Sequence, residues 1–278
     1  MSSEAEAEYF EAYRAARASG PAPDAQLDVE TSYGTVRVYR YGSGPPIVLL
    51  HGFNTSAAMW APFLPAFAAR HTVYTMDALG EAGASVQTAP FAVAADRARA
   101  LDEVFAELGL TGVHLVGASG GGWLAVNQVF HAPDRVATLS LLDPTTVVTQ
   151  FSVGVMWRAV LMTVLRSKRL LRRLVVYSAG VDLMDRPEVR VTLVGARTYQ
   201  LRLPMSAPPP RDALRAIRLP VLAVFAGRSS VHNSALAAHR ARELMPHASV
   251  EVWPEARHDM GAFADTRPIT DRVLAFLG

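Results

Sequence analysis

Short apolar runs alternate with segments of helical periodicity along most of the chain. The strand-length apolar runs from Pro46 onward are "PIVLL", "HTVYTMD", "GVHLVG", "VATLSLLD", "LPVLAVFAG" and "ASVEVW". Between and after them, apolar positions recur at helical spacing over residues 94–108 and again from Gly121, Ser234 and about Thr266. This alternation is typical of a mostly parallel β-sheet with helices on both faces.

The amino-terminal part of the chain has a different pattern. Apolar and aromatic residues recur at helical spacing within residues 4–18, and Gly20 followed by Pro21 ends this predicted helix. The next segment, "QLDVETSYGTVRVYRYG", alternates apolar and polar positions on either side of a Tyr-Gly turn, which predicts a β-hairpin. The hairpin and the six apolar runs together predict a sheet of eight strands.

The regular alternation is interrupted once, after the sixth predicted strand. Residues 145–210 are rich in methionine, leucine and basic residues, have a helical pattern, and end in the linker-like "LPMSAPPPR". We therefore expect an amino-terminal helix at 1–20, an α/β core formed by 21–144 and 211–278, and an inserted helical cap at 145–210.

Composition and charge exclude several classes of function. The 278 residues are 50% hydrophobic and 19% charged, and 27 Lys and Arg oppose 25 Asp and Glu, so the net charge of +2 argues against a nucleic-acid partner. Cysteine is absent, which excludes disulfides and thiolate metal sites. The acidic amino terminus is unlike a secretory signal, and no apolar run reaches the roughly 20 residues of a membrane span, so we expect a cytoplasmic protein. The oligomeric state stays open.

One serine lies in a glycine-rich turn between an apolar strand and a helix. Residues 117–121, "GASGG", match G-x-S-x-G and place Ser119 directly after "VHLV" and directly before a helical segment. Neighbours without Cβ atoms allow a tight turn and a close approach of substrate. The amide of Gly120 then lies at a helix amino terminus, where it can donate to a developing oxyanion. A glycine-rich turn with an incidental serine is the alternative interpretation.

The longer motifs carry a resemblance to a known family. The segments "PIVLLHGFNTSAAMW", "TVYTMDALGEAGAS", "VHLVGASGGGWLA" and "ARHDM" occur in the order and spacing of the α/β-hydrolase superfamily, which the chain resembles over nearly its whole length. It is most similar to bacterial carboxylesterase-like members that carry an amino-terminal helix before a "SYGT" hairpin. The resemblance implies the α/β-hydrolase fold with a nucleophilic serine, and no cofactor or metal; the sequence also lacks nucleotide-binding and zinc-binding motifs.

The resemblance also implies the residues around the serine. It makes His258 the general base and acid, and it makes the amide of Phe53 the second oxyanion donor beside Gly120. We expect the side chains of Phe53 and Asn54 to line the substrate pocket. Trp123, four residues after the serine, is expected to face the core or the pocket floor, and it is a candidate for substrate contact together with Phe53 and Asn54. The motifs assign two other histidines no chemical role: His51 is expected to support the oxyanion loop, and His232 has no assigned place.

The acid of the expected triad departs from the pattern of close relatives. Those proteins carry a carboxylate in a G-x-x-D/E turn after the seventh strand, whereas residues 227–230 here read "GRSS". Elsewhere in the superfamily the acid follows the sixth strand, where this chain has Asp143. Asp143 is therefore the candidate third member, with capping of the insertion ahead of Pro144 as the alternative. Without Asp143, Ser119 and His258 would form a dyad, or Ser230 and water would hold the imidazole.

Two other polar features are assigned structural roles. Asp77, at the end of the fourth strand, corresponds to a turn residue of the family. The basic run at 166–173 alternates basic pairs with leucines, which is typical of the solvated face of a cap helix; attraction of an anionic substrate or a membrane surface is the alternative.

Three functions are consistent with these motifs. The first is a serine hydrolase that cleaves an ester, thioester or lactone of a small to medium-sized apolar molecule through an acyl-enzyme on Ser119. The second, suggested by the displaced acid, is a lyase, cyclase or isomerase that uses the same scaffold for proton transfer. The third is a non-catalytic ligand-binding protein in which the serine and His258 are relics.

Overall fold

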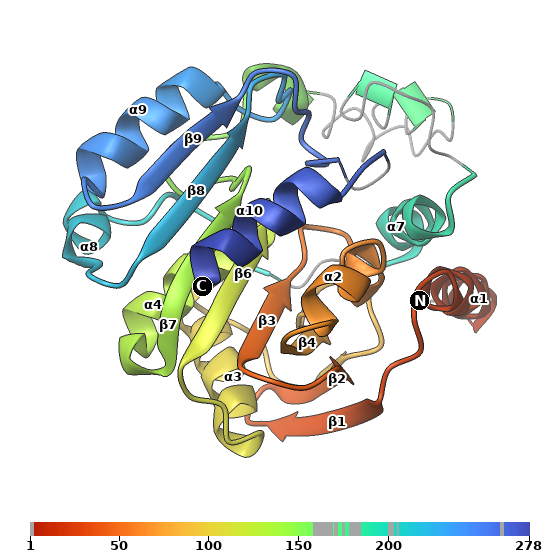
Figure 1. Cartoon of the computed structure of the whole chain (residues 1–278). Helices are drawn as coiled ribbons and strands as arrows, with labels where there is room; N and C mark the ends of the chain where they lie inside the picture. Colours follow the sequence, from red (N-terminus) through yellow and green to blue (C-terminus); the bar gives the residue numbers. More distant parts are fainter. Residues whose placement is uncertain are drawn as a thin grey trace.

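The computed structural model describes residues 3–157, 169, 172–173, 176–177, 185–199, 203–204, 206–261 and 264–278. A mostly parallel sheet forms the centre of the molecule (Figure 1). The strands in this part of the chain are β1 (Ala25–Thr31), β2 (Gly34–Tyr41), β3 (Pro46–Leu50), β4 (Thr72–Met76), β5 (Val86–Gln87), β6 (Val113–Ala118), β7 (Val136–Leu142), β8 (Val221–Ala226) and β9 (Ser249–Trp253).

Eight of these strands follow one another across the sheet in the order β1-β2-β4-β3-β6-β7-β8-β9. β2 is antiparallel to β1 and to β4, and every neighbouring pair from β4 to β9 is parallel. The predicted hairpin and the mostly parallel eight-stranded sheet are therefore confirmed. β5 was not anticipated: its two residues pair with β2, and such a short strand has no periodicity to detect.

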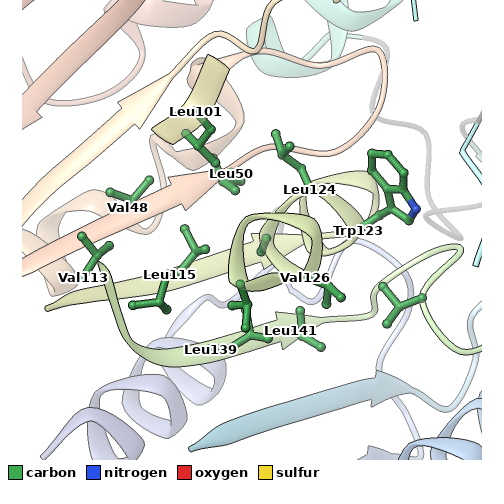
Figure 2. Packing of buried hydrophobic residues seen from close by; sticks show 14 of the residues in the cluster. Val48, Leu50, Leu101, Val113, Leu115, Trp123, Leu124, Val126, Leu139 and Leu141 are labelled. Atoms are coloured by element: carbon green, nitrogen blue, oxygen red, sulfur yellow. The ribbon is translucent and has the colours of Figure 1, made fainter. Parts of the chain in front are cut away.

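Alternating side chains of the central strands face two separate cores. In β3, Val48 and Leu50 belong to a core that includes residues of α3, α4 and α9, while Ile47 and Leu49 belong to the opposite core with α1, α2 and α10. Figure 2 shows the first core, where α4 packs on the sheet. The helices are α1 (Ser3–Ala18), η1 (Ala57–Trp60), α2 (Leu64–Ala68), α3 (Ala94–Glu107), α4 (Gly120–His131), η2 (Pro133–Arg135), α7 (Pro187–Thr198), α8 (Arg211–Ala216), α9 (Ser234–Leu244) and α10 (Arg267–Leu277).

The amino-terminal helix is fastened to the core through a buried aspartate. Asp77 is fully buried and accepts hydrogen bonds from the Tyr13 hydroxyl at 2.5 Å and from the amides of Ala57 and Ala84 at 2.8 Å each. Burial, and next the negative charge of Asp77, raises the pKa of Tyr13, so the hydroxyl stays protonated and can donate. Asp77 thus has the structural position expected for it.

The predicted cap at 145–210 is described only in part. Its α7 packs beside α1 (Figure 1), where Arg197 Nη2 lies 2.6 Å from Glu8 Oε1. The first helical residues after β7 are 153–157, so the expected helical pattern from 145 onward was wrong for residues 145–152. Most of the basic run at 166–173 lies outside the described residues, and the division into core and cap stays a prediction. In the described part of the chain, no helix has the length and apolar character to span a bilayer.

Buried His71 and partly buried His114 predict how the stability of the fold depends on pH. The rings of His71 and His114 lie 6.0 Å apart edge to face. Burial, and next the charge of Arg70, lowers the pKa of His71; burial, and next the charge of His71, lowers that of His114. The unfolded chain therefore takes up these protons first as the pH falls. Their contribution to stability is complete above pH 6.5, the ordinary value, and is lost as the pH falls below it.

We expect the double substitution His71→Gln and His114→Gln to weaken the loss of stability between about pH 7.5 and about pH 5.5. The measurement is the urea midpoint at both pH values. His239, exposed on α9, supplies the control, because His239→Gln should leave the wild-type pH dependence in place. An unchanged pH dependence in the double variant would contradict this account.

Candidate active site

Ser119 stands between the last residue of β6 and the first residue of α4 in a strained backbone conformation. Its φ of 51° and ψ of −117° lie in a region that side-chain-bearing residues rarely occupy, at a cost on the order of 1–3 kcal/mol. Three backbone hydrogen bonds hold the turn. The Ser119 amide donates to Leu142 at 3.0 Å, and its carbonyl accepts from Gly122 at 3.0 Å and from Thr145 at 3.1 Å.

The glycines around Ser119 are required by close backbone contacts. A Cβ atom on Gly121 would lie 2.1 Å from the carbonyl oxygen of Leu50, and one on Gly117 would lie 2.4 Å from that of Gly121. Both distances are far below van der Waals contact, and the obstacles are backbone atoms that cannot move aside. The G-x-S-x-G pattern is therefore a packing requirement of the β6–α4 turn.

The structure brings Ser119, His258 and Asp143 together in one hydrogen-bonded chain. His258 Nε2 lies 3.0 Å from Ser119 Oγ, and His258 Nδ1 lies 2.6 Å from Asp143 Oδ2. A carboxylate only accepts hydrogen bonds, so Nδ1 carries the proton and Nε2 faces the serine hydroxyl as an acceptor. The three residues follow β6, β9 and β7 respectively, which places them at the carboxyl edge of the sheet.

The carboxylate of Asp143 is fully buried and is surrounded by donors. Oδ1 accepts from the Ala226 amide at 2.9 Å, and Oδ2 accepts from Ser229 Oγ at 2.7 Å as well as from His258. A second histidine, His232, places Nε2 3.1 Å from Oδ1. Burial alone raises the pKa of Asp143, but the contacts with His232 and His258 outweigh it and hold the pKa well below its ordinary value. Asp143 is therefore ionised at neutral pH.

These contacts favour the triad interpretation of Asp143, which stays a prediction, over the capping interpretation. A residue that caps the insertion would direct its carboxylate to amides just after Pro144, yet the side-chain oxygens contact the loop after β8 and His258. No sequence motif marks Ser229 or His232, because their contacts with Asp143 depend on how the loop after β8 folds over β7. Ser230, the expected substitute, has a buried hydroxyl without a hydrogen-bond partner among the described residues.

The two residues expected to supply the oxyanion donors, Phe53 and Gly120, pack against each other. Gly120 is the first residue of α4, so its amide has no carbonyl partner within the helix. The Phe53 ring packs against Gly120 so closely that a Cβ atom on Gly120 would lie 2.6 Å from the ring carbons. His51 supports this loop as expected. Its Nδ1 lies 2.8 Å from the Gly52 carbonyl, and its Nε2 accepts from the Ala78 amide at 3.0 Å.

A buried ion pair that the sequence analysis did not foresee holds the next residue of the loop. Asn54 has a φ of 59°, and its amide donates to Glu81 Oε2 at 3.1 Å. Glu81 Oε1 in turn lies 2.7 Å from Arg97 Nη2, with both side chains at most 3% exposed. Replacing one partner of such a pair leaves an uncompensated buried charge, so the pair fixes the loop that carries Phe53.

Trp123 lies in the core, which is the first of its two expected places. Its side chain is 2% exposed, its indole nitrogen donates to the carbonyl of Ala207 at 2.8 Å, and the Arg97 guanidinium lies 5.5 Å from the ring. Figure 2 shows it at the end of the core cluster. Packing and the hydrogen bond to Ala207 occupy the indole here, so these contacts do not support the substrate contact predicted for Trp123, which stays a prediction.

The arrangement matches the requirements of nucleophilic acyl transfer. A serine hydroxyl contacts an imidazole, a buried carboxylate contacts that imidazole, and the amide of Gly120 follows the serine at a helix amino terminus. Among the described residues, no group of three or more His, Asp or Glu side chains is placed to hold a metal ion.

Comparisons with known proteins agree with this geometry. The model of the alpha/beta hydrolase family matches residues 47–270. The carboxylesterase YbfK of Bacillus subtilis (strain 168) is 27% identical over 97% of this chain and 93% of its own length. The crystal structure of that carboxylesterase, CesB (YbfK), superposes with a TM-score of 0.90 at 26% identity and covers 99% of this chain and 98% of its own.

A second solved structure shares the fold at lower identity. The naproxen esterase (carboxylesterase NP) of Bacillus subtilis has a TM-score of 0.92 at 22% identity, with all of both chains covered. The family match spans most of the polypeptide and includes Ser119, Asp143 and His258. The protein belongs to the alpha/beta hydrolase family.

The glycine contacts predict a large difference between two Gly→Ala substitutions. Gly121→Ala should lower the free energy of unfolding by about 3 kcal/mol or more, because the added Cβ meets backbone atoms at the turn. Gly109→Ala is the matched control. Its φ is +64° but no atom lies within 4 Å of the added Cβ, so it should cost only the strain of a left-handed residue, about 1–2 kcal/mol. Urea denaturation of both variants measures the difference, and equal losses would refute the packing explanation.

Proposed function

We propose that the protein is a serine carboxylesterase that cleaves an ester of a small to medium-sized apolar molecule through an acyl-enzyme on Ser119. Thioesters and lactones share the same acyl chemistry and belong to the same substrate range. The observation that carries the proposal is the continuous chain from Ser119 Oγ through His258 to Asp143, at 3.0 Å and 2.6 Å.

Ser119, His258 and Asp143 each have a defined role in this reaction. His258 Nε2 takes the proton of Ser119 as Oγ attacks the ester carbonyl, and Asp143 stabilises the imidazolium that forms. The amides of Phe53 and Gly120 hold the oxyanion of the tetrahedral intermediate. His258 then gives its proton to the departing alcohol. A water molecule, deprotonated by His258, releases the carboxylic acid and restores the serine.

The relatives support ester hydrolysis over the alternatives. Two Bacillus subtilis proteins that match at 27% and 25% identity over nearly the whole chain are named carboxylesterases. The lyase, cyclase or isomerase reading was motivated by the empty acid position after the seventh strand, and Asp143 in contact with His258 removes that motive. A non-catalytic binding protein has no need for the strained turn at Ser119.

The substrate would enter between the oxyanion loop and the cap. Phe53 lies on this loop, and its ring centroid is 6.5 Å from that of Phe151, which follows β7 at the start of the inserted segment. This aromatic pair and Asn54 would contact the apolar part of the substrate, and the segment 145–210 would select its size. The partner of the site is therefore a small molecule.

The nucleophile is tested by covalent labelling. A fluorophosphonate probe should modify the wild-type protein at Ser119, and Ser119→Ala should abolish both labelling and p-nitrophenyl ester hydrolysis, because no other serine contacts His258 among the described residues. Mass spectrometry of the labelled peptide and the release of p-nitrophenol are the measurements. Ser43→Ala, at an exposed serine, is the control and should retain both activities. A wild-type protein that resists a large excess of probe would rule the proposal out.

The acid is tested by substitution. Asp143→Asn should lower kcat by about 10⁴-fold, the loss seen when asparagine replaces the acid of a serine protease triad, because the amide favours the wrong tautomer of the histidine. Steady-state kinetics and a melting curve are measured together. Asp134→Asn, in the exposed η2, is the matched control. Full activity with only a lowered melting temperature in Asp143→Asn would show that Asp143 is structural.

A further inference from the structure

His232 is a buried histidine that the proposed reaction does not use. Its side chain is 1% exposed, whereas that of His258 is 20% exposed. Its Nε2 lies 3.1 Å from Asp143 Oδ1, on the opposite oxygen from the one that contacts His258. The Phe225 ring packs edge to face against the imidazole, with the centroids 6.0 Å apart at 88°. A buried imidazole held against the acid in this way acts on the acid.

The carboxylate of Asp143 has two polar neighbours at each oxygen. Oδ1 faces the Ala226 amide at 2.9 Å and His232 Nε2, and Oδ2 faces Ser229 Oγ at 2.7 Å and His258 Nδ1 at 2.6 Å. All of these neighbours except His258 come from the end of β8 and the loop that follows it. This loop carries no carboxylate of its own over residues 227–230, so it surrounds the acid of the neighbouring strand instead.

The orientation of such a carboxylate is not fixed by its own side chain. Rotation about the bond from Cβ to the carboxylate carbon is broad and two-fold, so only contacts keep one oxygen in line with His258 Nδ1. The Ala226 donor is a backbone amide, so a side-chain substitution at residue 226 does not remove it. His232 and Ser229 therefore supply the adjustable contacts, one on each oxygen.

We propose that His232 and Ser229 are positioning residues that hold the Asp143 carboxylate so that Oδ2 stays aligned with His258 Nδ1. The inference rests on the proposed ester hydrolysis, since it concerns the histidine of that reaction. His232 presents Nε2 to Asp143 Oδ1 at 3.1 Å, with both side chains at most 1% exposed. Neither ring nitrogen of His232 meets hydrogen-bond geometry with a partner among the described residues, so His232 acts on the carboxylate through the short polar contact of Nε2 with Oδ1. An aligned Oδ2 lets Asp143 stabilise the imidazolium of His258 that forms in the reaction.

The test compares substitutions that keep or remove the donor at the position of Nε2. Gln places an amide nitrogen near the position of His Nε2, whereas Leu fills a similar volume without any donor. We expect His232→Leu to lower kcat for p-nitrophenyl butyrate by about 10- to 100-fold with little change in KM, the range expected for the loss of one polar contact to a charged group. His232→Gln should recover most of the loss. His239→Leu, on the exposed face of α9, controls for the loss of a histidine.

A spectroscopic measurement separates positioning from general damage to the fold. The proton between His258 Nδ1 and Asp143 should give a far-downfield ¹H NMR signal in the wild type and in His232→Gln, and this signal should disappear or move upfield in His232→Leu. Wild-type kcat and an unchanged signal in His232→Leu would overturn the proposal, as would a failure of His232→Gln to recover activity. If His232→Leu does not fold, Ser229→Ala applies the same two measurements to the other oxygen, and unchanged values there overturn the proposal.

The same measurement distinguishes this inference from the proposed function. Absent labelling and absent ester hydrolysis in the wild type would refute the esterase, while the downfield signal and its response to His232→Leu would still report on the position of Asp143. Normal hydrolysis with a signal insensitive to both substitutions would refute only the positioning role.

Discussion

The site depends on the close backbone contact between β3, β6 and α4 at the turn that carries Ser119. Gly121 lies against the carbonyl of Leu50 so closely that no Cβ fits, and this contact forces the chain to reverse from strand to helix within one residue. Ser119 is the residue left in the strained conformation, with φ at 51°. Its hydroxyl, the first amide of α4 and the loop after β3 therefore meet at one point, and the strain is balanced by burial of the surrounding sheet.

The second requirement is to keep a negative charge buried at the end of β7. An isolated carboxylate in this place would be neutral, because burial raises its pKa. The loop after β8 prevents this by surrounding Asp143 with the Ala226 amide, Ser229 and His232, and the contact with His258 completes the set. The acid follows β7 and its polar neighbours lie at the end of β8 and in the loop after it, so the charged acid depends on the pairing of these two strands.

Buried carboxylates from other elements also hold the oxyanion loop and the amino-terminal helix. Glu81 and Arg97 form a buried pair whose carboxylate also accepts the amide of Asn54, so a charge pair from outside the loop holds the loop. Asp77 accepts the Tyr13 hydroxyl and thereby ties α1 to the core, and α1 in turn packs beside α7 of the inserted segment. Buried carboxylates therefore act at several places as fixed points for separate stretches of backbone.

The sequence by itself determined the parts of the protein that depend on local pattern. Alternating strands and helices predicted the sheet and its hairpin, and the spacing of glycines around Ser119 predicted the turn, because periodicity and the absence of a Cβ are local properties. His258 followed from its position after the last strand in a chain that resembles a known family. The two-residue β5 and the short helix α2 escaped prediction because they carry no periodic signal.

Only the tertiary structure decided which side chains meet across neighbouring strand ends. In the sequence, Asp143 was both a candidate triad acid and a candidate helix cap. Its backbone has a φ of 42°, and its carboxylate contacts His258 and the loop after β8. His232 and Ser229 gave no signal, since their contact with Asp143 arises where the loop after β8 folds back over β7. Trp123 could have faced the pocket or the core, and packing against Arg97 placed it in the core. Periodicity fixes the face of an element on which a residue lies, whereas contacts between distant loops depend on the packing of the whole sheet.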